Sequence, residues 1–385
     1  MTHFLRDILR QPEELRRTIE HLAGPKSAGR AALEAATEAI RGASYVYLTG
    51  MGSSWHAALN VGAIFHQHAH PVYLQDATEL LQFATLPRDA AIIVISRSGR
   101  SIEIVQLLAK ARDSGAKVIG ITNSPDGPLA KEAPISVVIP VGMDHAISVN
   151  TYSTLGAAAG ILASSVVDSF DSALAASLAH AVAEAGRSIP AWQEQLADTT
   201  WLAPHSTYYF LARGSSLGNC NEARLMWEEG VKSPATAMGT SSFRHGPQEI
   251  VAPRAGSRPP ETANKDLRFG IWIDGARMRE QDFAVARDLR RLGARVMLIG
   301  QKLPDDAGDL VFQLPAILPE WQFLIDILPA QLAAERLSQL SGVDCDSFRL
   351  SSYIVEDEYG LLPKEAGKEK RQEQRDSSLR RLRSE

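Results

Sequence analysis

The sequence has little of several features that would assign it to a specialised class of protein. It contains 2 cysteines in 385 residues, and neither belongs to a CxxC pair, so we expect neither a disulfide framework nor a zinc knuckle. Its longest apolar run, residues 155–167, is too short and too rich in glycine and serine to cross a bilayer. The N-terminus is charged and has no apolar stretch typical of a signal peptide. These absences predict a cytoplasmic protein.

An excess of positive charge is also missing. The formal net charge is -5, which excludes the general basic footprint expected of a nucleic-acid-binding protein. Residues 364–385 hold a basic cluster, but the acids interleaved with it are typical of a solvated tail. We therefore expect no nucleic acid and no membrane among the partners. The hydrophobic content of 45% is ample for the cores of two ordinary domains.

One stretch organises the chain. Residues 91–95 are five consecutive apolar residues, which predict a strand buried on both faces. The loop that follows is Ser96-Arg97-Ser98-Gly99-Arg100-Ser101, and it opens a helix with apolar residues at helical spacing. Hydroxyl groups and the N-terminal end of a helix favour an anion, and a phosphate is the obvious candidate. The alternative is that Ser101 is only an N-cap and the other serines only turn residues.

The rest of the chain alternates strands and helices. Strands are predicted at 45–48, 72–74, 91–95, 117–122 and 135–140 with helices between them. This pattern predicts an α/β fold with a parallel sheet covered on both faces.

The pattern then occurs a second time. Residues 44–54 are echoed by 206–216, which indicates two copies of one α/β domain joined by an alanine-rich helical connection over 154–196. In the second copy the loop after the predicted central strand, 274–277, has no serine, so only the first copy is expected to bind phosphate. We place the parts of the chain as an N-terminal helical segment (1–44), a first domain (45–155), a helical connection (156–205), a second domain (206–356) and a C-terminal tail (357–385).

Three motifs in register resemble the signatures of the sugar isomerase (SIS) family. They are Gly52-Ser53-Ser54-Trp55-His56-Ala57, the loop 96–101, and Phe243-Arg244-His245-Gly246-Pro247. The arrangement is similar to the isomerase half of glutamine-fructose-6-phosphate aminotransferase and to related amino-sugar-phosphate deaminases, isomerases and phosphosugar deglycases. The resemblance implies two SIS domains, each a parallel sheet of about five strands flanked by helices. It also implies a homodimer with the active site at the subunit interface, and calls for no cofactor.

The resemblance implies roles for individual residues. A sugar 6-phosphate would be held by Gly52, Ser53, Ser54, Ser96, Arg97, Ser98, Gly99 and Ser101. A glutamate sixteen residues before the motif histidine His245 would move the proton between C1 and C2, which gives Glu229, with Glu228 as the alternative. Successive helical residues point about 100° apart, so only one of the two should face the pocket. His245 would help to open the sugar ring, reaching in from the other subunit.

Two lysines of the aminotransferase family are absent here. Residues 346–356 contain no lysine, and Ser351 stands about where the Schiff-base lysine should be; Met226 replaces a second lysine. Imine chemistry through those lysines is therefore not expected, and Arg349 cannot act as an amine nucleophile. This favours an isomerase or deaminase of the glucosamine-6-phosphate/fructose-6-phosphate type, in which a carboxylate and an imidazole suffice.

Two other functions remain open at this stage. One is a deglycase that releases an amino acid from a 6-phosphorylated fructosyl amino acid; the other is a sugar-phosphate sensor without catalysis. The presence of both Glu229 and His245 favours a catalytic function over a sensor that only binds the sugar phosphate. The histidines at 66, 68 and 70 resemble a metal cluster, but they follow a helix end and no carboxylate or cysteine is adjacent, so no metal is expected. The roles of Asp144 and His145, near the sugar in the family, remain open.

Overall fold

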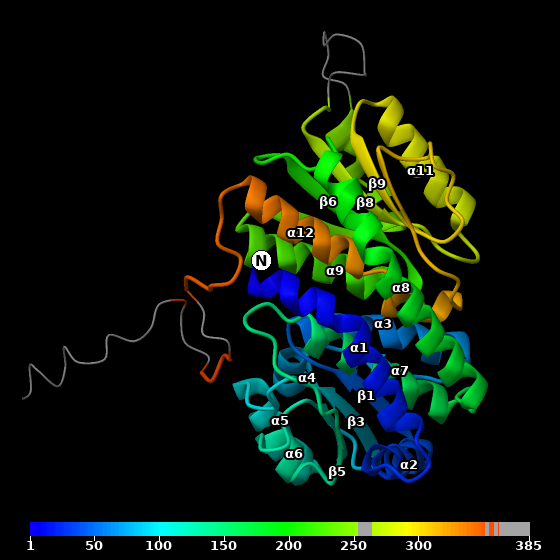
Figure 1. The fold of residues 1–385 in the computed structure, drawn as a ribbon. Coiled ribbons are helices and arrows are strands. Elements are labelled where there is room, and N and C mark those ends of the chain that lie inside the picture. Colours follow the sequence, from blue (N-terminus) through cyan, green and yellow to red (C-terminus); the bar gives the residue numbers. More distant parts are fainter. Residues whose placement is uncertain (253–263, 351–353, 358–360, 362–385) are drawn as a thin grey trace, which may run out of the picture.

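The computed structural model describes residues 1–252, 264–350, 354–357 and 361. The chain forms two lobes, one above the other, each built on a single parallel sheet (Figure 1). Both sheets have five strands, in the orders β2-β1-β3-β4-β5 and β10-β9-β8-β6-β7. The two orders are identical when the second is read from its other end and β6 to β10 are matched in turn with β1 to β5. The predicted α/β fold with an internal repeat is therefore confirmed.

The first lobe has its sheet in the middle and helices around it. All six residues of the central strand β3 (Ala90–Ile95) are buried, as the run of apolar residues predicts. The other strands are β1 (Tyr45–Thr49), β2 (Tyr73–Leu74), β4 (Lys117–Thr122) and β5 (Ile135–Val138). Its helices are α3 (Ser53–Gln67), α4 (Ala77–Phe83), α5 (Ile102–Ser114) and α6 (Pro128–Glu132).

The second lobe repeats this plan with shorter helices. Its strands are β6 (Thr207–Ala212), β7 (Ala235–Gly239), β8 (Leu267–Trp272), β9 (Arg295–Gly300) and β10 (Leu310–Gln313). Around them lie η1 (Gly214–Ser216), α9 (Leu217–Met226), η2 (Trp227–Val231), α10 (Thr240–Arg244), η3 (Pro247–Val251) and α11 (Arg279–Arg291). The strands β7 and β10, which form the two edges of this sheet, were not predicted from the sequence.

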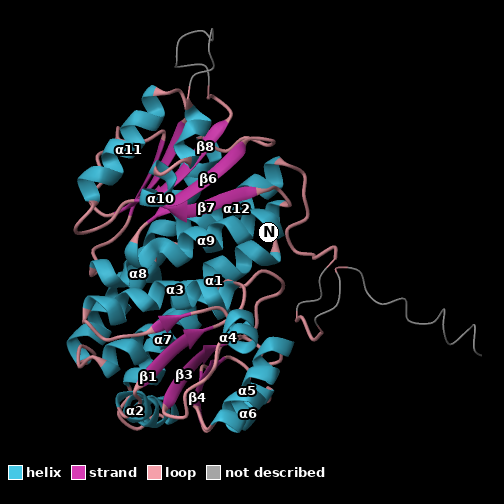
Figure 2. Ribbon diagram, turned by 180° about the vertical axis from the view of Figure 1, so that it is seen from behind, coloured by secondary structure: helices cyan, strands magenta, loops and turns pink. Residues whose placement is uncertain are grey.

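Helices fill the space between the two sheets (Figure 2). They include α3 and α9, which pack against each other, and five elements from the termini and the connection. Those five are α1 (His3–Ala23), α7 (Asn150–Val166), α8 (Ser172–Asp198), η5 (Pro319–Leu324) and α12 (Leu328–Leu340). One apolar core runs from β1 through these helices to β6, so the lobes are packed as one body. The remaining helix, α2 (Ala28–Arg41), packs on α7 and β5.

Some boundaries differ from the prediction. The helical connection expected at 154–196 is two helices, because the chain breaks after α7 and Asp171 caps α8 by accepting a hydrogen bond from the Leu174 N–H. The last helix, α12, begins at Leu328, after the 3-10 helix η5. The predicted tail lies outside the described residues apart from Asp357 and Leu361. None of the described helices has the length and hydropathy needed to span a bilayer.

Candidate active site

Two loops of the first lobe lie side by side because they follow the neighbouring parallel strands β1 and β3. One leads into α3 at Ser53 and the other into α5 at Ile102. The N-cap residues Gly52 and Ser101 make no side-chain capping hydrogen bond, so the Ser101 hydroxyl is not used as a helix cap. Two helix N-termini thus begin at one place, where N–H groups and helix dipoles favour an anion.

Hydrogen bonds within the second loop hold its shape. The Ser96 Oγ accepts from the Gly99 N–H at 3.1 Å, and the Ser98 Oγ accepts from the Arg100 N–H at 3.2 Å. Gly99 has φ of 63°, and a Cβ there would lie 2.7 Å from the Cβ of Leu129, so only glycine fits this turn. Because each serine oxygen accepts here, each hydroxyl hydrogen is left to donate to an anion.

A cavity of ≈ 370 Å³ opens over these two loops. Its wall includes seven of the eight residues predicted to hold phosphate, namely Gly52, Ser53, Ser54, Ser96, Arg97, Ser98 and Ser101. Gly99 forms the turn beneath them and is not part of the wall. Glu229 of the second lobe lines the same cavity. The structure therefore brings together the predicted anion site and the predicted carboxylate, in a volume suited to a small molecule.

Glu229 lies in a single π-helical turn, η2, which directly follows α9. Such turns interrupt the regular side-chain spacing of a helix and are frequent at functional sites. Burial and, to a smaller extent, the negative charge of Glu222 raise the pKa of Glu229 to about 7, against the opposing effect of Arg97 and Lys232. A carboxyl group with a pKa near neutrality can both take up and return a proton.

The neighbouring Glu228 has a different environment. Its side chain is exposed and pairs with Arg224 on the preceding turn, with 2.5 Å between the guanidinium Nη1 and the carboxylate Oε2. It is absent from the cavity wall. Of the two acids that the sequence left as alternatives, Glu229 is therefore the one that faces the anion site.

A buried pair that sequence reasoning missed lies behind Glu229. The Nδ1 of His56, on α3, is 2.7 Å from Oε2 of Glu222, on α9, and both side chains are almost fully buried. Glu222 lies seven residues before Glu229, and its negative charge acts on the Glu229 carboxyl group. The sequence signals for this pair were a histidine inside the first motif and a glutamate seven residues before Glu229.

The other predicted catalytic residue is not near Glu229 within one chain. His245 follows α10, is exposed, and does not line the cavity. Arg349 is exposed as well, and Ser351 lies outside the described residues. Met226 is fully buried.

Asp144 and His145 lie beside the cavity without lining it. The Asp144 carboxylate accepts hydrogen bonds from the N–H groups of Val149, Asn150 and Thr151 at 2.9–3.0 Å, and so caps the start of α7. His145 stacks on His3 with ring centroids 4.0 Å apart. Their contacts fix the loop that supplies two residues of the cavity wall, Ala146 and Ser148.

The matching loop of the second lobe is closed by its own hydrogen bonds. Ser215 Oγ donates to the Pro319 carbonyl at 2.8 Å, and Ser216 Oγ donates to Oδ2 of the buried Asp326 at 2.6 Å. Gly214 has φ of 54°, close to the 53° of Gly52, so the backbone turn is the same in both lobes. In the second lobe, however, the serine hydroxyls donate hydrogen bonds within the protein.

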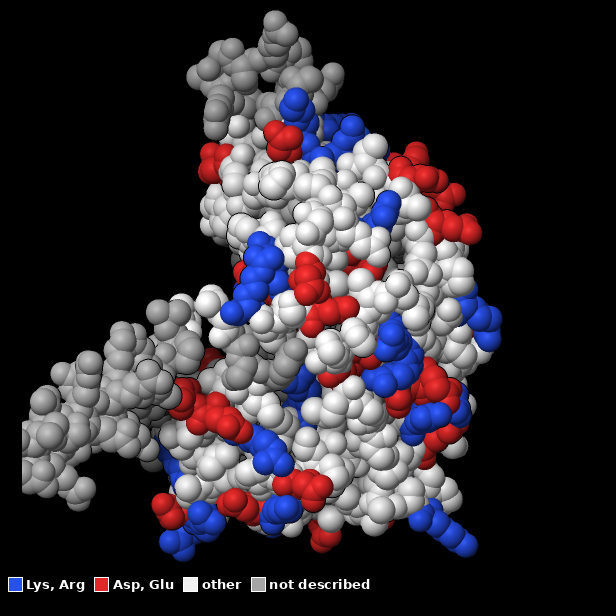
Figure 3. All heavy atoms as spheres, turned by 60° about the vertical axis from the view of Figure 1, so that its left-hand side comes forward, with Lys and Arg blue, Asp and Glu red and all other residues white. Residues whose placement is uncertain are grey.

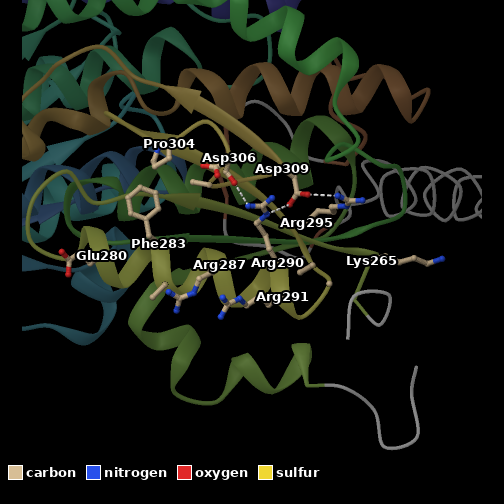
Figure 4. A pocket seen from close by; sticks show the side chains of 14 residues that line it. Lys265, Glu280, Phe283, Arg287, Arg290, Arg291, Arg295, Pro304, Asp306 and Asp309 are labelled. Atoms are coloured by element: carbon tan, nitrogen blue, oxygen red, sulfur yellow. Dashed lines mark hydrogen bonds and ion pairs between the residues drawn. The ribbon is translucent and has the colours of Figure 1, made fainter. Parts of the chain in front are cut away.

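A second hollow is larger but lacks this chemistry. It has a volume of ≈ 840 Å³ and lies beside α11, where Arg287, Arg290, Arg291 and Arg295 gather (Figure 4). Asp309 pairs with two of them, Arg290 at 3.6 Å and Arg295 at 2.7 Å. No residue of the three motifs lines it. Over the face drawn in Figure 3, charges of both signs are interspersed rather than gathered into a basic surface.

The three histidines that resemble a metal cluster do not converge. His68 Nδ1 lies 3.0 Å from the Ile64 carbonyl, and the His70 ring packs against Phe65. Within the described part of the chain, no three His, Cys, Asp or Glu side chains gather as metal ligands would.

Comparison with known proteins identifies similar chains. Residues 39–164 match the family model of the SIS domain. The chain is 25% identical over 322 residues to glutamine-fructose-6-phosphate aminotransferase of Bacillus subtilis strain 168, covering 81% of this chain and 51% of that protein. The chain thus spans about half the length of the curated relatives it matches.

Two solved structures share the fold. The C-terminal domain of glucosamine-fructose-6-phosphate aminotransferase from Francisella tularensis is 18% identical, with a TM-score of 0.76 over 89% of this chain and 97% of that one. Glucosamine-6-phosphate deaminase from Thermotoga maritima is 20% identical, with a TM-score of 0.73 over 92% and 99% of the two chains. At these identities the likeness is one of fold.

Proposed function

We propose that the chain, whose residues 39–164 match the family model of the SIS domain, is a phosphosugar isomerase or deaminase acting on a ketose or amino-sugar 6-phosphate. The observation that carries the proposal is the single cavity lined by the serine loops of the first lobe and by Glu229 of the second. The activities named for the similar proteins, an aminotransferase that isomerises fructose 6-phosphate and a glucosamine-6-phosphate deaminase, belong to the same reaction class.

The chemistry divides between the two ends of this cavity. The helix N-termini and serine hydroxyls hold the phosphate, which fixes the far end of the sugar. Glu229 removes a proton from C1 or C2, next to the carbonyl or imine carbon, and returns it to the neighbouring carbon. A pKa of about 7 suits both halves of this transfer. In a deaminase, water then replaces the amine on the resulting imine carbon, and ammonia leaves.

Ring opening needs a further acid and base, which we assign to His245 of a second copy of the chain. The exposure of His245 and its absence from the cavity of its own chain support this assignment. The active unit is then a homodimer. Sedimentation velocity tests this directly, since a monomer with full activity would exclude a shared site.

The reaction is tested with a panel of substrates. Fructose 6-phosphate, glucosamine 6-phosphate, galactosamine 6-phosphate and fructosyl amino acid 6-phosphates are incubated with the protein, and products are followed by mass spectrometry. An isomeric sugar phosphate identifies an isomerase, and ammonia a deaminase. A free amino acid with hexose 6-phosphate would instead identify a deglycase. Phosphosugar binding without any product would identify a sensor.

The role of Glu229 is tested with a matched pair of variants. Glu229→Gln is expected to lose turnover by about 10²- to 10⁴-fold, the usual contribution of a positioned general base, while it still binds phosphosugar. Glu228→Gln alters the adjacent, exposed acid and should keep turnover within about threefold, as expected of a group outside the cavity. Equal losses in the two variants would exclude Glu229 as the specific base.

A further inference from the structure

Arg97 lines the cavity together with the serines and Glu229. It belongs to the serine loop, yet its guanidinium donates a hydrogen bond from Nη1 to the Oγ of Ser148, 3.3 Å away, which lines the cavity from another loop. Its backbone is fixed separately, because its carbonyl accepts from the Thr122 hydroxyl at 3.1 Å. The guanidinium is therefore tied to Ser148, a residue of the cavity wall outside the loop that carries Ser96 and Ser98.

Arg97 also supplies the positive charge on the described wall of the cavity that holds the proposed base. Among the described residues that line the cavity, the ionisable ones are Arg97, Glu103 and Glu229. Arg97 is a charge partner of Glu229, whereas Arg100 of the same loop is exposed and does not line the cavity. An arginine cannot lose its proton in a protein, so this positive charge is permanent.

The proposed proton transfer creates a negative charge that must be stabilised. When Glu229 removes the proton from C1 of a ketose, the C–H electron pair becomes the C1–C2 double bond, and the C2 carbonyl pair moves onto its oxygen. The product is an enediolate and a protonated Glu229. The proton of the C1 hydroxyl then passes to this oxygen, and Glu229 returns its proton to C2, which leaves an aldose. No oxidant or reductant is needed.

We propose that Arg97 is a catalytic residue that stabilises the enediolate oxygens at C1 and C2, with Ser148 holding its guanidinium in place. This inference rests on the proposed function. It gives the loop arginine a role at the reacting carbons rather than at the phosphate, and it accounts for enolisation in a chain with Met226 and Ser351 in place of two lysines. A fixed donor aimed at a developing oxyanion is worth about 10²- to 10³-fold in rate.

Two ligands separate this role from phosphate binding. One is 5-phospho-D-arabinonohydroxamate, whose hydroxamate mimics the enediolate; the other is D-arabinitol 5-phosphate, which keeps the phosphate and carbon chain but has only hydroxyls at the head. Their affinities are measured by calorimetry on the full-length protein. Arg97→Gln should weaken hydroxamate binding by about 30-fold or more and arabinitol phosphate by less than about threefold, because only the first presents an oxyanion mimic. Arg100→Gln, the matched control, should leave both affinities within about threefold.

The remaining outcomes overturn the inference. Equal weakening of both ligands by Arg97→Gln would make Arg97 a phosphate ligand, and no weakening of either would remove it from the site. Thermal melting shows whether Arg97→Gln is folded, and Ser148→Ala provides a second variant, expected to lower hydroxamate affinity alone. If the wild-type protein binds neither ligand, the proposed function fails and this inference with it. With an active substrate, Arg97→Gln should lower kcat and leave KM within about threefold, as for an interaction made in the transition state.

Discussion

His56 of the first lobe and Glu222 of the second meet between the two sheets, with the histidine Nδ1 2.7 Å from the glutamate Oε2. His56 lies in the first turn of α3, close behind the serines that line the cavity, and Glu222 lies two turns before Glu229. One buried contact thus joins the helix that starts at the anion site to the helix that leads to the proposed base. It adds to the hydrogen bonds between Asn60 and Asn219, which join the same two helices.

Removing one partner of this pair should destabilise the whole chain. We expect His56→Ala to lower the free energy of unfolding by about 3 kcal/mol, because it leaves the Glu222 carboxylate buried without its partner. His66→Ala, an exposed position on the same helix, should change it by less than about 0.5 kcal/mol. Urea denaturation followed by circular dichroism measures both. Equal small effects would show that the pair does not hold the lobes together.

Activity should depend on the ionisation of Glu229. The group acts first as a base, so it must be ionised in the free enzyme, and burial raises its pKa to about 7. We expect kcat/KM to rise about tenfold per pH unit below 7 and to level off above it. The substrate phosphate has a second pKa near 6, so the affinity for arabinitol 5-phosphate over the same pH range supplies the correction. A corrected profile that is flat from pH 5.5 to 8.5 would contradict this assignment.

The same raised pKa predicts a stability effect of defined sign. The pKa of Glu229 is about 7 in the folded protein, whereas in the unfolded chain it falls to the ordinary value of 4.5. Folding is therefore penalised progressively between these values and fully above 7. Glu229→Gln should raise the free energy of unfolding by about 1 to 2 kcal/mol at pH 8, allowing for partial exposure, and leave it unchanged at pH 4. Denaturation curves at both pH values test this, with Glu228→Gln as the control that should show no such gain.

The strand-loop-helix units of the first lobe could be predicted from the sequence alone. Local signals decide them: an apolar run for the strand, glycine and serine for the turn, and helical spacing after it. The match of β4 with the predicted 117–122 shows how well such signals define a buried strand. The edge strand β7 lacks such an apolar run, and all five of its residues are only partly buried.

Contacts between residues far apart in the chain could not be predicted from the sequence. Asp144 caps the start of α7, yet in the sequence it is only an acid in a loop. The hydrogen bond from Ser216 to Asp326 joins residues 110 positions apart in the chain, and no local sequence pattern signals it. Helical periodicity could not decide between Glu228 and Glu229, because both lie in the π-helical turn η2, where the side-chain spacing is irregular.

The turn at Gly99 should tolerate no side chain. An alanine there would need a left-handed backbone and would press its Cβ against Leu129, which lies 2.7 Å away. We expect Gly99→Ala to lower the free energy of unfolding by about 2 kcal/mol and to weaken phosphate binding, because the loop must shift. Gly42→Ala, at a right-handed helix end where a Cβ would make only ordinary van der Waals contacts, should be neutral or slightly stabilising. Wild-type phosphate affinity in Gly99→Ala would show that the turn does not shape the anion site.

The internal repeat provides a matched test of which lobe binds phosphate. Ser54 and Ser216 occupy equivalent places after glycines of nearly equal φ, but Ser54 lines the cavity whereas Ser216 donates to the buried Asp326. Ser54→Ala should weaken binding of arabinitol 5-phosphate by about tenfold, the worth of one hydrogen bond to a charged group, with little change in stability. Ser216→Ala should leave binding unchanged and lower the free energy of unfolding by about 1 to 3 kcal/mol, because Asp326 loses a donor where no water can replace it. Calorimetry and urea denaturation on both variants separate the two roles. A loss of phosphate affinity in Ser216→Ala alone would move the anion site to the second lobe.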